Sequence, residues 1–150
     1  MSEITYGSAQ QIVQDFLLAL ESRKLERIMS CFSSNAVVVI PLSIDGRPDP
    51  WFTFEGTRQV TEYWTNAVRS LRRIGFSRKE LTVSADATTV FCEAEGDMRR
   101  YEDGEEYRNV YVFRFDIASG KITRLLEYAN PVTVANFGGG AVVENLHVPQ

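Results

Sequence analysis

A single glutamate lies in an otherwise apolar stretch near the C-terminal end of the chain. On an extended strand, Glu127 shares a face with Leu125 and Ala129. A carboxyl group among such neighbours has a raised pKa, because loss of water disfavours its charged form. It can then take and give a proton near pH 7, which predicts general acid/base chemistry at Glu127. The alternative is an exposed edge-strand glutamate paired with Arg99 or Arg114, and the sequence leaves both open.

Every second residue of another predicted strand is polar or aromatic. Asn109, Tyr111, Phe113 and Phe115 share one of its faces. One interpretation is a pocket wall, in which Asn109 and Tyr111 offer hydrogen bonds to a carbonyl or hydroxyl group and Phe113 contacts the substrate. The other is ordinary core, with the amide and the hydroxyl satisfied by the backbone. Core packing is favoured for the two phenylalanines, whereas Asn109 is balanced between the interpretations.

Two further glutamates, Glu93 and Glu95, lie two residues apart on one face of a third predicted strand. A pair of carboxylates suits acid/base work or an ion pair, and Glu93 is a candidate substrate-binding residue. The other face of this strand carries Val90, Cys92 and Ala94 and is typical of core. That pattern favours two solvated glutamates on the outside of the sheet.

Aromatic residues gather around a predicted long helix. Tyr63 and Trp64 lie in its apolar stripe, which indicates core packing; the functional alternative has Tyr63 projecting its hydroxyl into a cavity as a donor or proton relay. Trp64 and Phe54 are candidate substrate contacts. Trp51 and Phe52 lie in the turn-rich segment before the helix, where aromatic residues gate a pocket, form an interface or cap a core.

Other kinds of site lack the residues they need. His147 is the only histidine and lies in a glycine-rich tail, so a nucleophile–histidine–acid arrangement and a zinc site are both excluded. The sequence has no phosphate loop and no GxGxxG motif, so we expect no nucleotide cofactor and no metal. Cys31 and Cys92 are far apart among apolar neighbours, which predicts two reduced, buried thiols.

Helices are predicted in the first half of the chain, where apolar residues recur at helical spacing. The predicted helices cover residues 8–21, 24–32 and 58–73. A two-residue junction makes the first two a helical hairpin, and Gly75 is the expected C-cap of the third. A short β-branched strand over 36–40 precedes a segment of turn residues over 42–53.

After Phe76 the hydrophobic period changes to two. The predicted strands cover residues 77–85, 88–99, 106–117 and 121–130. Short turns link them, which predicts an antiparallel meander. Helices followed by strands give an α+β fold, a single domain over residues 1–150 in which helices pack on a curved antiparallel sheet enclosing a pocket. An error of one residue in strand phase would turn Glu127 outward. The tail, 136–150, is expected to be flexible or to close the pocket or a dimer.

Composition narrows the class of protein. The chain has 150 residues, of which 44% are hydrophobic and 11% aromatic, so it can bury a core and is not wholly disordered. A net charge of −4 argues against nucleic acid as the main partner and leaves a small-molecule substrate. No apolar run is long enough to span a membrane, and no signal peptide is readable, so we expect a cytoplasmic protein.

The order helix, helix, strand, long helix and four-stranded meander resembles the nuclear transport factor 2-like (NTF2-like) fold, also called SnoaL-like or ketosteroid isomerase-like. The last predicted strand resembles that of SnoaL-like proteins, most of all the phenazine-biosynthesis A/B branch, whose proteins end it with a Glu-aromatic-x-Asn-Pro run. The matching stretches here are Gly120-Lys121-Ile122 and Leu126-Glu127-Tyr128-Ala129-Asn130-Pro131, with further similarity at Phe54-Glu55-Gly56, Glu95-Gly96, and Asn109 before Tyr111.

The resemblance implies roles for particular residues. In the phenazine branch the strand glutamate is an acid/base residue, which carries over to Glu127. That branch also has a functional histidine on the long helix, where this chain has Tyr63. The departure implies a related scaffold with different chemistry.

Limonene-type epoxide hydrolases are a second similar group, with an aspartate where Glu127 stands. Their chemistry uses two carboxylates bridged by an arginine. Glu93 or Glu95, together with Arg99 and Asn109, are the residues available here for those roles.

Two hypotheses of different classes follow. The first is a cofactor-free cyclase or isomerase of secondary metabolism acting on a small carbonyl or imine compound. Glu127 moves the proton, while Asn109, Tyr63 and Tyr111 orient the substrate and stabilise negative charge. The second is a non-catalytic ligand-binding or assembly module. Both predict a homodimer, because the outer face of the sheet carries apolar residues on adjacent strands.

Overall fold

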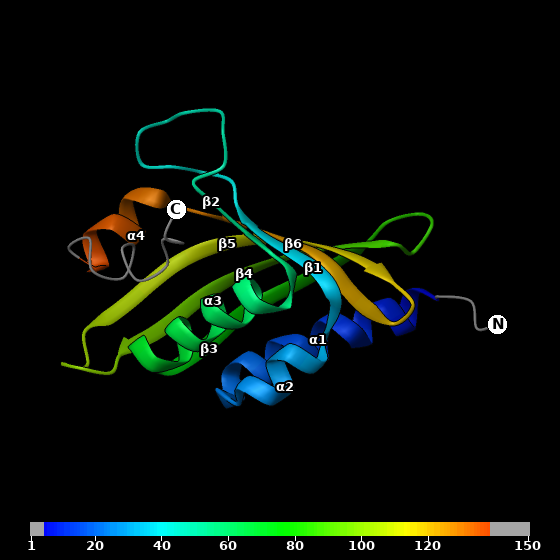
Figure 1. Cartoon of the computed structure of the whole chain (residues 1–150), viewed down its shortest axis with the longest axis horizontal. Coiled ribbons are helices and arrows are strands. Elements are labelled where there is room, and N and C mark those ends of the chain that lie inside the picture. The colour runs from blue at the N-terminus through cyan, green and yellow to red at the C-terminus, as the bar shows by residue number, and fades with distance from the viewer. Residues whose placement is uncertain (1–4, 139–150) are drawn as a thin grey trace.

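The computed structural model describes residues 5–138, in which helices cover one face of a curved, unclosed sheet (Figure 1). In chain order the elements are α1 (Tyr6–Ser22), α2 (Leu25–Ser30), β1 (Phe32–Ile40), β2 (Phe52–Glu55), α3 (Gly56–Ser70), β3 (Leu71–Val83), β4 (Thr89–Arg100), β5 (Glu106–Ala118), β6 (Lys121–Ala129) and α4 (Pro131–Gly138). The predicted α+β class is confirmed. No helix among these residues is long and apolar enough to cross a membrane.

The sheet is mixed rather than antiparallel. Its strand order is β2-β1-β6-β5-β4-β3, and the predicted four-stranded meander from β3 to β6 is present. β1 adds to the open edge of β6 in the parallel direction, which corrects the expected all-antiparallel sheet. The pattern of a meander predicts only the hairpins between consecutive strands. The pairing of β1 with β6 joins residues about 90 positions apart in the sequence, such as Phe32 and Ile122, and is a tertiary contact.

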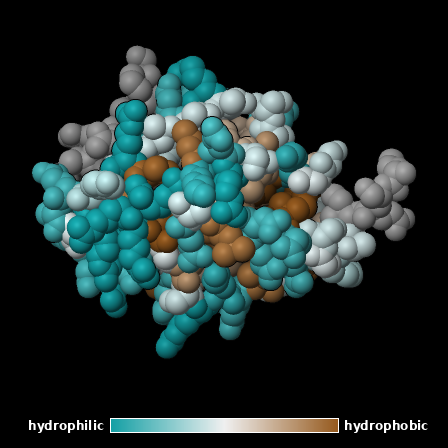
Figure 2. All heavy atoms as spheres, turned by 90° about the horizontal axis from the view of Figure 1, so that it is seen from below, coloured by the Kyte–Doolittle hydropathy of each residue, from teal (hydrophilic) through white to brown (hydrophobic). Residues whose placement is uncertain are grey.

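The core lies between the inner face of the sheet and the first three helices. Phe16 of α1 packs against Phe115 of β5 with ring centroids 5.5 Å apart, and against Trp64 of α3 at 5.6 Å. Such pairs stabilise a core beyond the area they bury. Seen from below, the molecule shows mainly hydrophilic side chains with smaller hydrophobic areas between them (Figure 2).

α3 ends at Ser70, three residues before the end that its apolar pattern predicts, and Arg23 of the helical hairpin binds its last turn. Arg23, in the left-handed conformation at the end of α1, donates from Nε to the Leu71 carbonyl at 2.7 Å and from Nη2 to the Val68 carbonyl at 2.8 Å. These bonds satisfy carbonyls that a helix end leaves open. Leu71 then pairs with Arg100 of β4, so the expected helix over 71–73 is strand, and Gly75 lies inside β3 rather than capping a helix.

A strand lies where the sequence predicts turns. Phe52 and Phe54 point inward from β2, which pairs with β1 across the loop of Asp45-Gly46 and two prolines. β2 is four residues long, too short for its alternation to be distinguished from a loop. β1 likewise begins at Phe32, four residues before the predicted strand, and α2 is correspondingly shorter.

The predicted tail begins inside a helix. Asn130 accepts a hydrogen bond from the Val132 backbone N–H at 3.0 Å, and Pro131 follows as the first helical residue of α4. Asparagine at the N-cap and proline at the next position are a common start for a helix. The first residues of the predicted tail, 136–138, are thus the end of α4, while the remainder, including His147, lies outside the described residues.

Both cysteines are free thiols, as predicted, but they differ in burial. Cys92 is fully buried on the inner face of β4, and burial raises the pKa of its thiol to about 11. Cys31 is half-buried, which corrects the expectation of two buried thiols.

Candidate active site

A cavity of about 120 Å³ lies between the inner face of the sheet, α3 and α4. Its wall is largely aromatic and aliphatic, with one carboxyl group and no lysine or arginine among the described lining residues. The apolar part includes Leu20, Ile40, Trp51, Phe52, Trp64, Ile74, Phe76, Met98, Phe113, Val134 and Phe137. An apolar cavity with a few polar groups is the usual form of a small-molecule site.

Glu127 supplies the carboxyl group of the cavity. It pairs with Phe113 across β5 and β6 and therefore faces inward, so the predicted strand phase is confirmed. The Tyr63 hydroxyl lies 3.0 Å from both Oε1 and Oε2 and shares its proton between them. Loss of water raises the pKa of Glu127 from 4.5 to about 7, against the lowering effect of the Tyr63 hydrogen bond. The group is therefore close to half-ionised at neutral pH.

Tyr63 is held by aromatic packing on both sides. Its ring lies 4.6 Å from the ring of Phe54 and 4.6 Å from that of Trp64, measured between centroids. Burial, followed by the charge of Glu127, raises the pKa of Tyr63 well above its ordinary value. Tyr63 therefore stays protonated and donates to Glu127 across the working pH range.

A second polar group of the cavity lies on β5, where Tyr107 and Tyr111 are lining residues. Asn109 lies between them on the same face and donates from Nδ2 to the Tyr107 hydroxyl at 2.8 Å. The rings of Tyr111 and Phe113 stack at 5.0 Å. Space for the Tyr111 ring comes from Gly96 of β4, where an added Cβ would lie 2.5 Å from Tyr111 Cε2.

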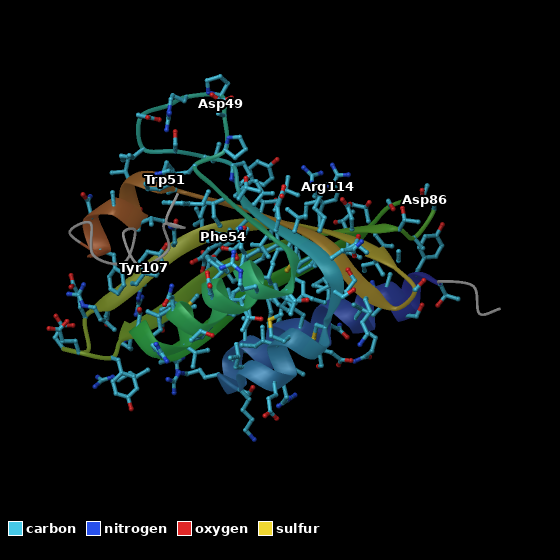
Figure 3. All side chains as sticks on the ribbon, viewed as in Figure 1. Asp49, Trp51, Phe54, Asp86, Tyr107 and Arg114 are labelled. Carbon is cyan, nitrogen blue, oxygen red and sulfur yellow. The ribbon has the colours of Figure 1, made fainter. Side chains whose placement is uncertain are left out.

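α4 closes one end of the cavity. Phe137 lines it and packs on Tyr107 with ring centroids 4.7 Å apart. Arg100 of β4 donates to the Phe137 carbonyl at 2.7 Å and places its guanidinium 4.9 Å from the Phe137 ring centre. Trp51 and Tyr107 lie at the end of the sheet where α4 packs, far from Asp86 in the turn between β3 and β4 (Figure 3).

Five of the predicted site residues meet at the cavity, and three do not. Glu127, Tyr63, Tyr111, Trp64 and Phe113 line it. The other three do not line it: Phe54 packs on Tyr63, Asn109 is buried and bonds the Tyr107 hydroxyl, and Glu93 is exposed on the outer face of β4. Alternation along a strand gives the face of a residue but not its depth behind the cavity wall.

The residues considered for a site with two carboxylates bridged by an arginine, Glu93, Glu95 and Arg99, do not line the cavity. Glu95 lies on the outer face with Glu93, and Arg99 donates to Asp97 and pairs with Glu106 at 3.2 Å. The described cavity wall therefore offers Glu127 as a single carboxyl group without an arginine bridge.

Sequence reasoning missed Tyr107 and the residues of α4. Tyr107 precedes Asn109 by two positions, so the period-two pattern that selects Asn109 and Tyr111 extends back to it. Phe137 carried no comparable signal, because its helix follows a strand end and contacts β5 only in the folded chain.

A sequence profile described as the SnoaL-like domain matches residues 13–125. The chain belongs to this family. The uncharacterized protein YesE of Bacillus subtilis strain 168 is 24% identical to this SnoaL-like protein over 139 residues, covering 93% of this chain and 92% of that one.

Solved structures share the fold. A Bacillus subtilis protein provisionally named as an isomerase superposes with a TM-score of 0.78 at 25% identity, covering 94% of this chain and 98% of that one. A phenazine biosynthesis-related protein of Pseudomonas aeruginosa gives 0.74 at 17%, covering 97% and 85%. An NTF2-like protein of Burkholderia xenovorans LB400 gives 0.70 at 18%, covering 89% and 97%. The predicted NTF2-like, SnoaL-like fold is confirmed.

Proposed function

We propose that this SnoaL-like protein is a cofactor-free isomerase or cyclase that moves a proton beside the carbonyl group of a small neutral compound. One arrangement carries the proposal: an inward carboxyl group with a pKa of about 7, held by Tyr63 in an apolar cavity. A base is most effective when its pKa lies near the working pH. The solved relative named as an isomerase agrees with this class of reaction.

The proposed isomerisation needs one carboxyl group that acts first as a base and then as an acid. Glu127 as carboxylate takes a proton from the carbon beside the carbonyl, and the C–H electron pair forms the C=C bond of an enolate. Protonated Glu127 then returns the proton to a different carbon, which completes an isomerisation. Tyr63 holds both oxygens of the carboxylate in place without removing the lone pairs that face the cavity.

The charges on the cavity wall and the volume of the cavity limit which substrates can bind. A phosphate or carboxylate on the substrate would find no lysine or arginine on the described wall and would lie beside Glu127. Burying an unpaired charge in this way is costly. A cavity of about 120 Å³ is comparable with one of about 150 Å³ that accepts benzene. We therefore expect a neutral ketone, enone or imine of about one ring.

Exchange of ketone protons tests the proposal without the natural substrate. Cyclohexanone and 2-cyclohexenone are incubated with the protein in D₂O, and loss of the α-proton signals is followed by NMR. We expect exchange to fall at least 100-fold in Glu127→Gln, in keeping with the usual contribution of a general base. Glu93→Gln makes the same change on the exposed outer face and should exchange like the unaltered protein.

Two results would contradict the proposal. Exchange in Glu127→Gln at the unaltered rate would remove Glu127 as the proton carrier. Binding of the ketones without any exchange would favour the ligand-binding module, which keeps its ligand unchanged.

A further inference from the structure

Aromatic rings form much of the wall around Glu127. Nine of the twenty lining residues among positions 5–138 are aromatic, and two helices and three strands contribute to them. Aliphatic side chains would make the cavity equally apolar. The face of an aromatic ring carries partial negative charge, which an aliphatic chain lacks. A wall of this kind can therefore attract a positive charge as well as exclude water.

Three of these rings form a corner beside the carboxyl group. Phe113 pairs with Glu127 across β5 and β6, and its ring stacks on that of Tyr111 with planes 9° apart. Phe76 of β3 stands nearly perpendicular to both, at 73° to the Tyr111 ring and 81° to the Phe113 ring, with centroids 5.9 Å and 5.8 Å away. We call these three rings the aromatic corner. Perpendicular rings can enclose a cation from two sides, as the aromatic cages of ammonium-binding sites do.

The negative charge of Glu127 has no cationic partner on the described wall. No lysine or arginine lines the cavity, and Glu127 forms no ion pair within residues 5–138. The Tyr63 hydroxyl, 3.0 Å from each carboxylate oxygen, is its one hydrogen-bond donor in that part of the chain. A carboxylate has about four lone-pair sites, so several remain for a ligand. A buried carboxylate without a partner is costly, and a cation entering the cavity would remove that cost.

The other titratable groups that face Glu127 do not supply charge at neutral pH. They are Tyr63 on α3 and Tyr107 and Tyr111 on β5, and no further titratable side chain lines the described wall. Burial raises the pKa of all three tyrosines, so each keeps its proton and stays neutral. Glu127 is then the one full charge of the described wall, and it is negative.

We infer that the cavity binds a further class of ligand, beyond the neutral substrates of the proposed reaction: the ammonium ion of a small cyclic amine. Its N–H groups donate to the lone pairs that Tyr63 leaves free on Glu127, and its charge lies against the aromatic corner. The charge-assisted hydrogen bond and the attraction to the rings replace the water that the ammonium group loses. The inference concerns binding and holds whether or not Glu127 moves a proton.

Three cyclohexane derivatives of similar size test the inference. At pH 8, where Glu127 is mostly ionised, cyclohexylamine is a cation, cyclohexanol is neutral and cyclohexanecarboxylate is an anion. Calorimetric titration of the unaltered protein gives the dissociation constant of each. We expect cyclohexylammonium to bind about ten-fold more tightly than cyclohexanol, and the carboxylate to bind most weakly. At pH 5.5, where Glu127 is mostly protonated, the advantage of the cation over the alcohol should be lost.

Three variants assign the preference to particular side chains. Glu127→Gln keeps the shape of the side chain without a charge to bury, and should bind cyclohexylammonium no more tightly than cyclohexanol. Glu93→Gln makes the same change on the exposed outer face of β4 and should keep the preference. Phe113→Leu keeps an apolar side chain but removes one ring of the aromatic corner, and should reduce the preference about three-fold.

Two results with the unaltered protein would overturn the inference: cyclohexanol bound as tightly as cyclohexylammonium at pH 8, or no binding of the amine. A preference for the amine that persists in Glu127→Gln would also overturn it, because the cation would then be held elsewhere. Ketone exchange that persists in Glu127→Gln would instead overturn the proposed function and leave the preference for the amine intact, so the two failures are distinguishable.

Discussion

The hydroxyl of Tyr63 lies 3.0 Å from both carboxylate oxygens of Glu127, although 64 positions separate the two residues. A helix and the last strand of the sheet provide the two sides of this contact. Burial and the charge of Glu127 raise the pKa of Tyr63 well above its ordinary value, so Tyr63 keeps its own proton. In the function proposed above, Glu127 is the proton carrier and Tyr63 holds its carboxyl group in place.

The stability of the protein should fall as pH rises toward neutrality because of Glu127. Its folded-state pKa is about 7 against 4.5 for the free group, so between these values the folded chain binds more protons than the unfolded chain. This group therefore destabilises the fold by up to about 3 kcal/mol above pH 7 and has no effect below pH 4.

Urea unfolding of the unaltered protein and of Glu127→Gln between pH 5 and pH 8 measures this effect. The variant should gain stability relative to the unaltered protein as pH rises. A constant difference across that range would mean that Glu127 is not desolvated.

The pH dependence of ketone exchange should report the same group. For a base with a pKa of about 7, kcat/KM rises with pH and levels off above neutrality. Because the Tyr63 hydrogen bond lowers the pKa of Glu127, Tyr63→Phe should move the midpoint to higher pH. Tyr128→Phe is the matched control and should keep the midpoint. A midpoint that moves to lower pH in Tyr63→Phe would contradict the arrangement.

Substituting Gly96 should damage the tyrosine side of the cavity. A Cβ at Gly96 would lie 2.5 Å from Tyr111 Cε2 and 3.1 Å from Met98 Cε, so the buried Tyr111 ring would have to move. We expect Gly96→Ala to cost about 1–3 kcal/mol of unfolding free energy and to slow the exchange of ketone protons.

Gly7→Ala makes the same change in α1, where the nearest atom is 4.0 Å away, and should stabilise the protein by up to about 1 kcal/mol. Thermal or urea unfolding compares the two variants. Equal effects would show that the space above Gly96 is not required.

Arg100 should hold α4 over the cavity. Its guanidinium donates to the Phe137 carbonyl, packs on the Phe137 ring and pairs with Asp103 at 2.8 Å. Arg100→Met keeps the apolar stem but removes these bonds, so the amides of α4 should exchange with deuterium about five-fold faster. Arg124→Met, which removes an exposed arginine 3.9 Å from Asp116, should leave α4 unchanged. Unaltered exchange in Arg100→Met would remove the arginine as the anchor of α4.

The outer face of the sheet should form a homodimer. Val110 and Val112 point outward from β5 and are 62% and 37% exposed, with Glu93 beside them on β4 and Arg114 farther along β5. A second copy related by a two-fold axis can place acidic groups of one protomer against basic groups of the other. Light scattering at micromolar concentration should give a dimer.

Val110→Asp should convert the dimer to a monomer, because it places charge in the apolar contact. Val132→Asp, at an exposed valine on α4, should not. A monomer from the unaltered protein would refute the dimer.

Much of the fold and part of the site are readable in the sequence for local reasons. Helical spacing and period-two alternation depend on neighbouring residues alone, so α1, α3 and the meander follow from the pattern. The sequence left the direction of Glu127 open, and its pairing with Phe113 turns it inward. The raised pKa of Glu127 was one of two alternatives in the sequence, and burial in the folded chain accounts for it.

Tertiary contacts decided the rest, because they join residues that no local pattern relates. Arg23 ends α3 by binding the Leu71 and Val68 carbonyls, and β1 joins β6 in parallel. Asn109 has the polarity of a substrate contact in the sequence, yet its side chain forms four hydrogen bonds within the protein, and Tyr107 rather than Asn109 lines the cavity. The sequence by itself determined which side chains can carry a proton. Only the packing of α3, β5, β6 and α4 around one cavity decided which of them can reach a substrate, since depth and free hydrogen-bonding capacity are properties of the assembled wall.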